Sequence, residues 1–210
     1  SGTHALASTL SFHPVKHICA GEGGAVLTND LHVAQKALRL RSHGINRPFT
    51  ETDEMPWYYE QESLGWNYRL TDLQATLGLS QLSRLDDFLA KRRKLARRYD
   101  QRLSESPFQE HINCPPFEEG HAWHLYIIRF KDVSLRNLAY KYLKSKNILT
   151  QVHYIPVYKH PYYQKQNQGF QLPGAEKFFQ GCLSIPMYPD LKENEQDRVL
   201  ETLEQFLLKG

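Results

Sequence analysis

The stretch Ser11-Phe-His-Pro-Val-Lys-His-Ile-Cys-Ala-Gly-Glu-Gly-Gly24 places one lysine, Lys16, between an extended segment and a glycine-rich turn. Thr9 to Phe12 has the character of a short strand, Pro14 ends regular structure, and the glycines that follow allow a tight turn. A lysine on such a loop can face a pocket, where partial removal from water or nearby cations make its amine nucleophilic. The alternative is an ordinary loop lysine, because most lysines are exposed.

Three further motifs follow in order along the chain. They are Leu40-Arg-Ser-His-Gly44, Gly65-Trp-Asn-Tyr-Arg-Leu-Thr-Asp-Leu-Gln-Ala75 and Gln151-Val-His-Tyr-Ile-Pro-Val-Tyr158. Together with the Lys16 stretch they resemble the DegT/DnrJ/EryC1/StrS family of pyridoxal-phosphate sugar aminotransferases, over nearly all of the chain. The last motif is most similar to the branch that makes UDP-4-amino-4,6-dideoxy-N-acetyl-altrosamine on the route to pseudaminic acid.

This resemblance implies an α/β chain that forms the back half of a fold-type I pyridoxal-phosphate-dependent transferase. Residues 1–95 are expected to be the C-terminal part of the large cofactor-binding domain, and residues 96–210 a small α+β C-terminal domain. In the family, the front half carries the aromatic that stacks on the pyridine ring and the acid that pairs with its nitrogen. Ser1 takes the place of that aspartate, so the pairing acid is not identifiable here.

The same resemblance implies roles for three residues of a cofactor site. Lys16 is expected to anchor pyridoxal 5'-phosphate covalently and to move protons between substrate and cofactor. Ser11 is expected to contact the phosphate, and Asn67 to reach the phosphate of the neighbouring subunit's cofactor across a homodimer interface. A structural strand serine and a turn asparagine are the alternatives. Arg69 is expected to help by salt bridging or charge balance, with a structural ion pair as the alternative.

The motif near residue 153 is expected to contact the substrate. In the resembled enzymes, the segment that holds His153, Tyr154 and Tyr158 approaches the sugar-nucleotide pocket, where aromatic and hydroxyl groups pack against the sugar and hydrogen-bond it. A buried, satisfied histidine–tyrosine pair is the alternative. His13 and His17 do not predict a metal site, because Pro14 and the loop spoil the spacing.

The activity implied by the resemblance moves an amino group from glutamate to C4 of a UDP-linked 4-keto-6-deoxy-N-acetylhexosamine. The related sugar 3-dehydratases carry histidine in place of the lysine, so Lys16 argues against their chemistry. An alternative from a different class is a non-catalytic remnant, a folded interaction module that keeps the motifs but lacks the cofactor half.

Composition narrows the function classes further. The formal net charge of the 210-residue chain is only +3, and its basic residues alternate with acids except near Lys91-Arg-Arg-Lys94 and Arg97-Arg98. That cluster is interpreted as a solvated helix face, with a phosphate contact as the alternative, so nucleic acid is not required. Three widely spaced cysteines favour a reducing cytoplasm, and no apolar run is long enough to span a membrane.

Periodicity and end signals predict the elements. Residues 24–29 are expected to form a strand, and Asp30 to cap a helix that runs to about Ser42 and buries Val33, Ala37, Leu38 and Leu40. Residues 44–64 are expected to be a long functional or interface loop. Thr71 is expected to cap a helical region that continues, with a break, to about Leu103. The remaining predictions are strands at 124–130, 149–154 and 182–185, and helices at 134–146, capped by Ser134, at 174–180 and at 193–208.

Overall fold

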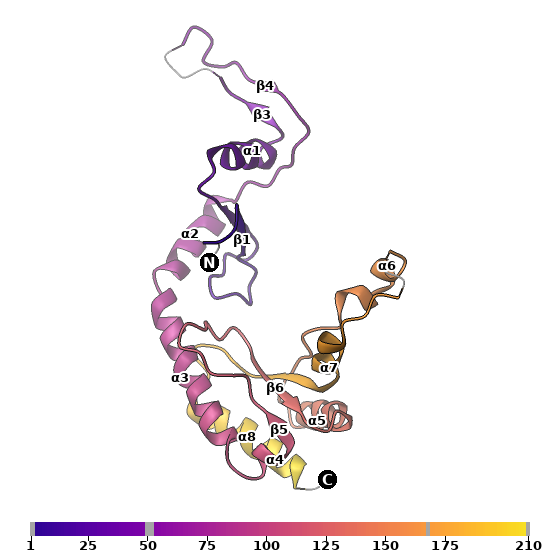
Figure 1. Cartoon of the computed structure of the whole chain (residues 1–210). Coiled ribbons are helices and arrows are strands. Elements are labelled where there is room, and N and C mark those ends of the chain that lie inside the picture. Colours follow the sequence, from indigo (N-terminus) through magenta and orange to yellow (C-terminus); the bar gives the residue numbers. More distant parts are fainter. Residues whose placement is uncertain (1–2, 49–52, 167–168, 209–210) are drawn as a thin grey trace. The chain divides into compact units, whose positions relative to one another are not determined.

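The computed structural model describes residues 3–48, 53–166 and 169–208, and it divides into two compact units (Figure 1). Unit 1 is Ser1–Leu85 and unit 2 is Asp86–Gly210. The boundary lies at the first turn of helix α3 (Leu85–Leu103), whereas the predicted domain boundary after residue 95 lies further along the same helix.

Unit 1 begins with an antiparallel hairpin that holds the Lys16 stretch. Strands β1 (Ser8–Ser11) and β2 (Gly24–Leu27) pair in this hairpin, and helix α1 (Leu31–Arg41) follows. Asp30 caps α1 as predicted, since its Oδ1 accepts a hydrogen bond from the Val33 N–H at 3.0 Å. The predicted buried side of α1 is wrong: no residue of the helix is buried, and Leu38 is 53% exposed.

The physical reason is that unit 1 has almost no core of its own. Ala20 is the single buried hydrophobic residue in the described part of this unit. An amphipathic helix buries its apolar stripe only where another layer packs over it. The described part of unit 1 supplies no such layer for α1.

The rest of unit 1 agrees with the predicted helix and refines the predicted loop. Strands β3 (Ile45–Asn46) and β4 (Glu60–Gln61) form a short antiparallel pair inside the stretch predicted as a long loop. Helix α2 (Asp72–Leu82) begins at a capping box, in which Thr71 Oγ1 accepts from the Gln74 N–H and Gln74 Oε1 accepts from the Thr71 N–H. The predicted break in the helical region falls between α2 and α3.

Unit 2 is built on a three-stranded antiparallel sheet with the strand order β5-β6-β7. The strands are β5 (Ile112–Asn113), β6 (Tyr126–Phe130) and β7 (Cys182–Ile185). The helices of this unit, besides α3, are α4 (Phe108–His111), α5 (Ser134–Ser145), the 3-10 turn η1 (Val157–Lys159), α6 (Pro161–Gln164), α7 (Pro173–Gly181) and α8 (Glu193–Leu207). Its core joins side chains of β6 and β7 to those of α3, α5 and α8.

Two predictions for unit 2 are wrong in detail. Residues 149–154 do not form a strand: only Gln151 pairs with β7, at Ser184, and Pro156 soon follows without an N–H to extend a ladder. Ser134 does not cap α5 but is its first residue. Asp132 accepts from the Ser134 N–H at 2.9 Å and from its hydroxyl at 2.7 Å, which satisfies that end of the helix.

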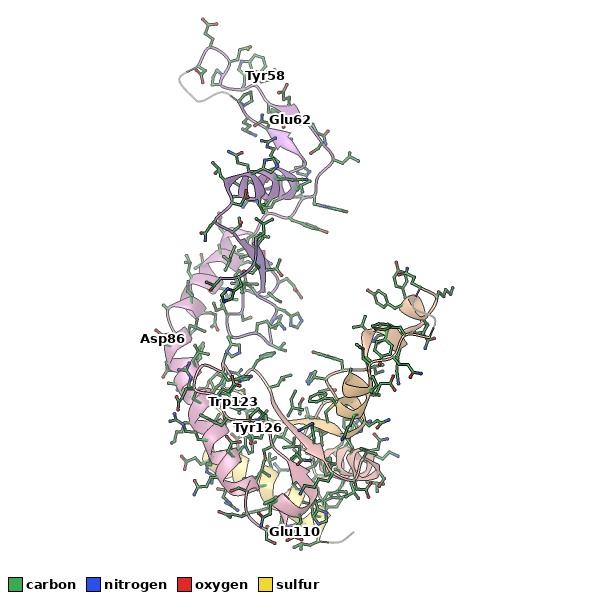
Figure 2. The ribbon with its side chains drawn as sticks, viewed as in Figure 1. Tyr58, Glu62, Asp86, Glu110, Trp123 and Tyr126 are labelled. Carbon is green, nitrogen blue, oxygen red and sulfur yellow. The ribbon has the colours of Figure 1, made fainter. Side chains whose placement is uncertain are left out.

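A group of aromatic rings fills the centre of unit 2. Trp123 and Tyr126, labelled in Figure 2, are fully buried and stack with ring centroids 5.6 Å apart. The Tyr126 hydroxyl donates to Asp100 of α3 at 2.5 Å. Burial, followed by that hydrogen bond, raises the pKa of Tyr126, so the phenol stays protonated.

Helix α3 is fixed to its surroundings through a buried arginine. The Nη1 atom of Arg92 lies 3.0 to 3.1 Å from the carbonyl oxygens of Trp123, His124 and Met187. Because Nη1 carries two hydrogens, at least one of them is shared between acceptors. Burial lowers the pKa of Arg92.

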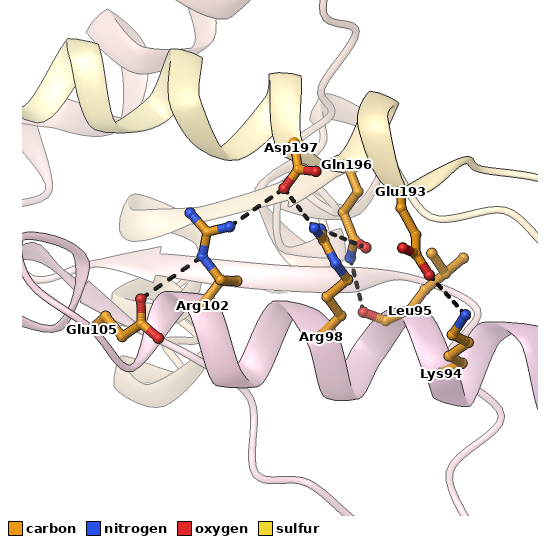
Figure 3. Close-up of polar contacts among 8 residues, drawn as sticks. All are labelled: Lys94, Leu95, Arg98, Arg102, Glu105, Glu193, Gln196 and Asp197. Carbon is orange, nitrogen blue, oxygen red and sulfur yellow. Dashed lines mark hydrogen bonds and ion pairs between the residues drawn. The ribbon is translucent and has the colours of Figure 1, made fainter.

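Four further cations of the basic cluster lie beside acids. On the α8 side, Lys94 pairs with Glu193 at 2.7 Å and Arg98 with Asp197 at 2.6 Å (Figure 3). Lys91 contacts Asp87 and Asp190, and Arg97 contacts Glu119. A surface whose positive charges are neutralised this way favours the interpretation as a structural and solvated helix face over a phosphate site.

Candidate functional site

The loop that carries Lys16 is closed at its base by one residue. The Phe12 N–H donates to the Gly23 carbonyl, and the Phe12 carbonyl accepts from the Ala20 N–H, both at 2.9 Å. The β1–β2 ladder therefore ends in a compact loop over residues 13–19. Lys16 lies partly buried in the middle of this loop, and its N–H donates to the His13 carbonyl at 2.9 Å.

Helix α2 and the residues before it support the loop from behind. A Cβ added at Gly23, which has a φ of +148°, would lie 2.7 Å from Cδ1 of Leu70. A Cβ added at Gly78 of α2 would lie 3.7 Å from Cβ of Ala20. Leu70 and α2 therefore pack directly on the base of the loop, and Gly23 leaves the space that Leu70 fills.

Polar groups that could serve a phosphorylated cofactor lie on both sides of the loop base. Ser11 ends β1 with an exposed side chain, and its Oγ accepts from the His13 N–H at 3.4 Å. His13 Nε2 is 4.0 Å from a carboxylate oxygen of Glu22. The loop and its base thus present an amine, a hydroxyl and an imidazole. An amine can react with the aldehyde of a pyridoxal phosphate, and hydroxyl and imidazole groups can donate hydrogen bonds to its phosphate.

Asn67 is placed by the end of helix α1. The last carbonyls of a helix have no partner within it. The Trp66 N–H donates to the Leu40 carbonyl at 2.7 Å and the Tyr68 N–H to the Arg41 carbonyl at 2.9 Å. Asn67 lies between these two contacts and forms a β-bridge with Ser42, so its backbone is held while its side chain is exposed.

The predicted substrate residues lie in unit 2, between the edge of the sheet and α7. His153 is partly buried, and its Nδ1 is 2.7 Å from Oγ of Ser184 on β7. The Tyr154 ring meets the His153 ring edge to face, at a centroid distance of 4.6 Å, and is 71% exposed. This pair combines one fixed imidazole with one open aromatic surface.

Tyr158 takes part in a cluster of polar contacts that we name the Glu176 clasp: Tyr158, Lys159 and Glu176. The Tyr158 hydroxyl donates to Glu176 at 2.8 Å and accepts from the Leu172 N–H at 3.2 Å. The Lys159 ammonium lies 2.8 Å from the other carboxylate oxygen of Glu176. The hydrogen bond from Lys159 and then that from Tyr158 hold the pKa of Glu176 below its usual value.

The six predicted site residues thus fall into two groups. Lys16, Ser11 and Asn67 belong to unit 1, and His153, Tyr154 and Tyr158 to unit 2. Residues that sequence reasoning missed are Ser184 and Glu176, which contact His153 and Tyr158. Among the residues that the structure describes, no group of three or more histidine, cysteine or acidic side chains could hold a metal ion, and no helix is long and apolar enough to cross a membrane.

Comparison with known proteins identifies the family of this chain. The profile of the DegT/DnrJ/EryC1/StrS aminotransferase family matches residues 1–204. The chain belongs to this family. The resemblance drawn from the four motifs is therefore confirmed at the family level, and the family is one of enzymes.

Two curated relatives give the scale of the match. The spore coat polysaccharide biosynthesis protein SpsC of Bacillus subtilis is 37% identical over 97% of this chain. The UDP-4-amino-4,6-dideoxy-N-acetyl-beta-L-altrosamine transaminase of Helicobacter pylori is 34% identical over 99% of this chain. These alignments cover 54% and 55% of the relatives, so the chain spans about half the length of the curated relatives it matches.

Solved structures confirm the fold. PseC of Helicobacter pylori, described as an aminotransferase of pseudaminic acid biosynthesis, superposes with a TM-score of 0.89 at 31% identity, over 98% of this chain and 54% of that one. Spr1654 of Streptococcus pneumoniae, solved in a PMP form, gives a TM-score of 0.88 at 27% identity, over 100% of this chain and 55% of that one. The predicted class, part of an α/β fold-type I transferase, is thereby confirmed.

Proposed function

We propose that this chain supplies the lysine anchor and part of the sugar pocket of a pyridoxal-phosphate-dependent aminotransferase. The reaction moves an amino group from glutamate to C4 of a UDP-linked 4-keto-6-deoxy-N-acetylhexosamine, in a cytoplasmic homodimer. The observation that carries the proposal is the partly buried Lys16 on a closed loop in a chain of this family. The altrosamine transaminase of Helicobacter pylori supports the sugar class.

Each residue has a separate task in this proposal. The cofactor, when bound, supplies the electron-withdrawing ring that lets an amine exchange with a ketone. Lys16 holds it covalently and carries a proton at Nζ, while the Ser11 hydroxyl binds the phosphate. Asn67 donates a hydrogen bond to the phosphate of the partner subunit's cofactor, and Arg69 balances the negative charge of that phosphate. His153, Tyr154 and Tyr158 bind the sugar nucleotide.

One observation favours a second candidate function, the non-catalytic interaction module. The described part of unit 1 buries a single hydrophobic residue, Ala20, and exposes large apolar side chains on α2. A unit with so little core is complete only when another surface covers it. On this alternative the chain binds a partner through unit 1 and carries no cofactor.

Covalent capture of the cofactor distinguishes the two candidates. We expect the purified chain, incubated with pyridoxal 5'-phosphate and reduced with borohydride, to gain one pyridoxyl group on the peptide that contains Lys16, as read by mass spectrometry. Lys16→Ala is expected to remove the label, whereas Lys36→Ala, on the exposed side of α1, is expected to keep it. If the unsubstituted chain gains no pyridoxyl group, this chain alone does not bind the cofactor covalently. If Lys16→Ala still gains the group, Lys16 is not the anchor.

A further inference from the structure

The segment that carries His153 lies along the free edge of strand β7. Gln151 and Ser184 exchange both backbone hydrogen bonds, with N···O distances of 3.1 Å and 2.7 Å. Ser184 and Cys182 lie two positions apart on β7, so their side chains point to the same face of the strand. His153 lies against this face: its Nδ1 is 2.7 Å from Oγ of Ser184, and the Cys182 thiol lies 3.9 Å from its carbonyl oxygen.

On this face the Ser184 hydroxyl meets the imidazole rather than the backbone. Ser184 is only 5% exposed, and its Oγ is 2.7 Å from Nδ1 of His153. A hydroxyl that is buried in this way needs a partner, and the imidazole provides it. The alternative partner on the same face, the Cys182 thiol, is fully buried, and burial raises its pKa, so it stays a neutral thiol.

We propose that Ser184 is a positioning residue that fixes the imidazole ring of His153. Because a serine hydroxyl can donate to a bare Nδ1 or accept from a protonated one, this contact holds the ring in place in either tautomer. Ser184 thereby sets the orientation of the ring. The part of this inference that concerns the sugar nucleotide rests on the proposed function, in which His153 binds the substrate.

The first test reads the ring itself and needs no activity. NMR spectra of the imidazole nitrogens, assigned with His153→Gln, are expected to show a hydrogen-bonded Nδ1 in the unmodified chain. In Ser184→Ala the Nδ1 signal of His153 is expected to shift, and Ser184→Thr is expected to restore it. Strand β7 is expected to form in Ser184→Ala, because its pairing with neighbouring segments uses only backbone groups.

Cys182→Ala is the matched control, because it truncates a buried side chain on the same face of the same strand. We expect it to leave the His153 ring signals in place. Ring signals that do not change in Ser184→Ala, or that change equally in Cys182→Ala, would overturn the positioning role. If Ser184→Ala does not fold, Ser184→Thr and Ser184→Cys supply the same comparison, with Cys expected to shift the Nδ1 signal because a thiol makes only a weak hydrogen bond.

A second test addresses the substrate and uses a preparation of the chain that has aminotransferase activity. Ser184→Ala is expected to raise KM for the keto-sugar about tenfold, the size of one lost hydrogen bond, with a smaller effect on kcat. Shifted ring signals with an unchanged KM would support the positioning role and contradict the proposed role of His153 in substrate binding. The two proposals can therefore fail separately.

Discussion

Arg92 shows how much one buried side chain contributes to unit 2. Its Nη1 satisfies three carbonyls from two separate segments of the chain. Replacing it by alanine removes this donor from the buried carbonyls of Trp123 and Met187, so we expect Arg92→Ala to lower the free energy of unfolding by about 3 kcal/mol. Urea denaturation of the chain measures this loss.

Arg97 of the same helix provides the matched control. It is exposed and pairs with Glu119 at the surface, so Arg97→Ala is expected to cost less than about 1 kcal/mol. Equal losses in the two variants would contradict the special role of Arg92. A smaller loss is expected in Arg92→Lys, because the three contacts all use one nitrogen and an ammonium carries three donors on one nitrogen.

The residues of the candidate site differ in how far sequence could predict them. Lys16, Ser11 and Asn67 stand inside contiguous motifs, and the structure places Lys16 and Ser11 at one loop. Ser184 could not be predicted, because its contact with His153 depends on the register between two segments that are far apart in the sequence. Glu176 escaped prediction for the same reason.

At the scale of elements, the Glu176 clasp joins η1 to the start of α7. The lowered pKa of Glu176 means that the folded chain binds this proton less readily than the unfolded chain. The clasp therefore contributes stability above the usual carboxyl pKa of 4.5 and loses it as the pH falls through the lower folded value. We expect the Leu172 amide to exchange faster, relative to its intrinsic rate, as the pH is lowered through this range.

Glu176→Gln separates this effect from general acid unfolding. The variant keeps an acceptor for Tyr158 but cannot titrate, so its Leu172 amide is expected to show no such dependence. A pH dependence that survives in Glu176→Gln would assign the effect to another group.

Helices with clear end signals could be predicted, and strands at the sheet edge could not. Asp30 and Thr71 cap their helices as predicted, because a side-chain acceptor at an N-terminus is a local feature. The expected strand at 149–154 shrinks to one bridge at Gln151, since strand length depends on which partner is available. The buried side predicted for α1 required a layer that the described part of unit 1 does not contain.

At the scale of the whole molecule, α2 of unit 1 exposes four leucines: Leu73, Leu77, Leu79 and Leu82. Leu73 is 86% exposed and Leu79 is 68% exposed, and no residue of the helix is buried. A helix that is apolar on several sides is usually covered by other polypeptide. We expect the chain alone to self-associate, and the double variant Leu73→Gln with Leu79→Gln to reduce this association in sedimentation velocity experiments.

Leu138→Gln on α5 of unit 2 is the control for this prediction. It removes a leucine that is 54% exposed and is expected to leave the association unchanged. An effect of Leu138→Gln equal to that of the double variant would show that association does not depend on α2.

The contact between Gly44 and Gly65 has a consequence for how this chain tolerates change. A Cβ added at Gly65 would lie 2.2 Å from the Gly44 nitrogen, so the two ends of the excursion formed by residues 45–64 meet backbone to backbone at the end of α1. Lengthening a loop whose ends stay together costs little entropy. We therefore expect changes in length between β3 and β4 to leave the backbone position of Asn67 unchanged, because Asn67 lies outside the closed segment.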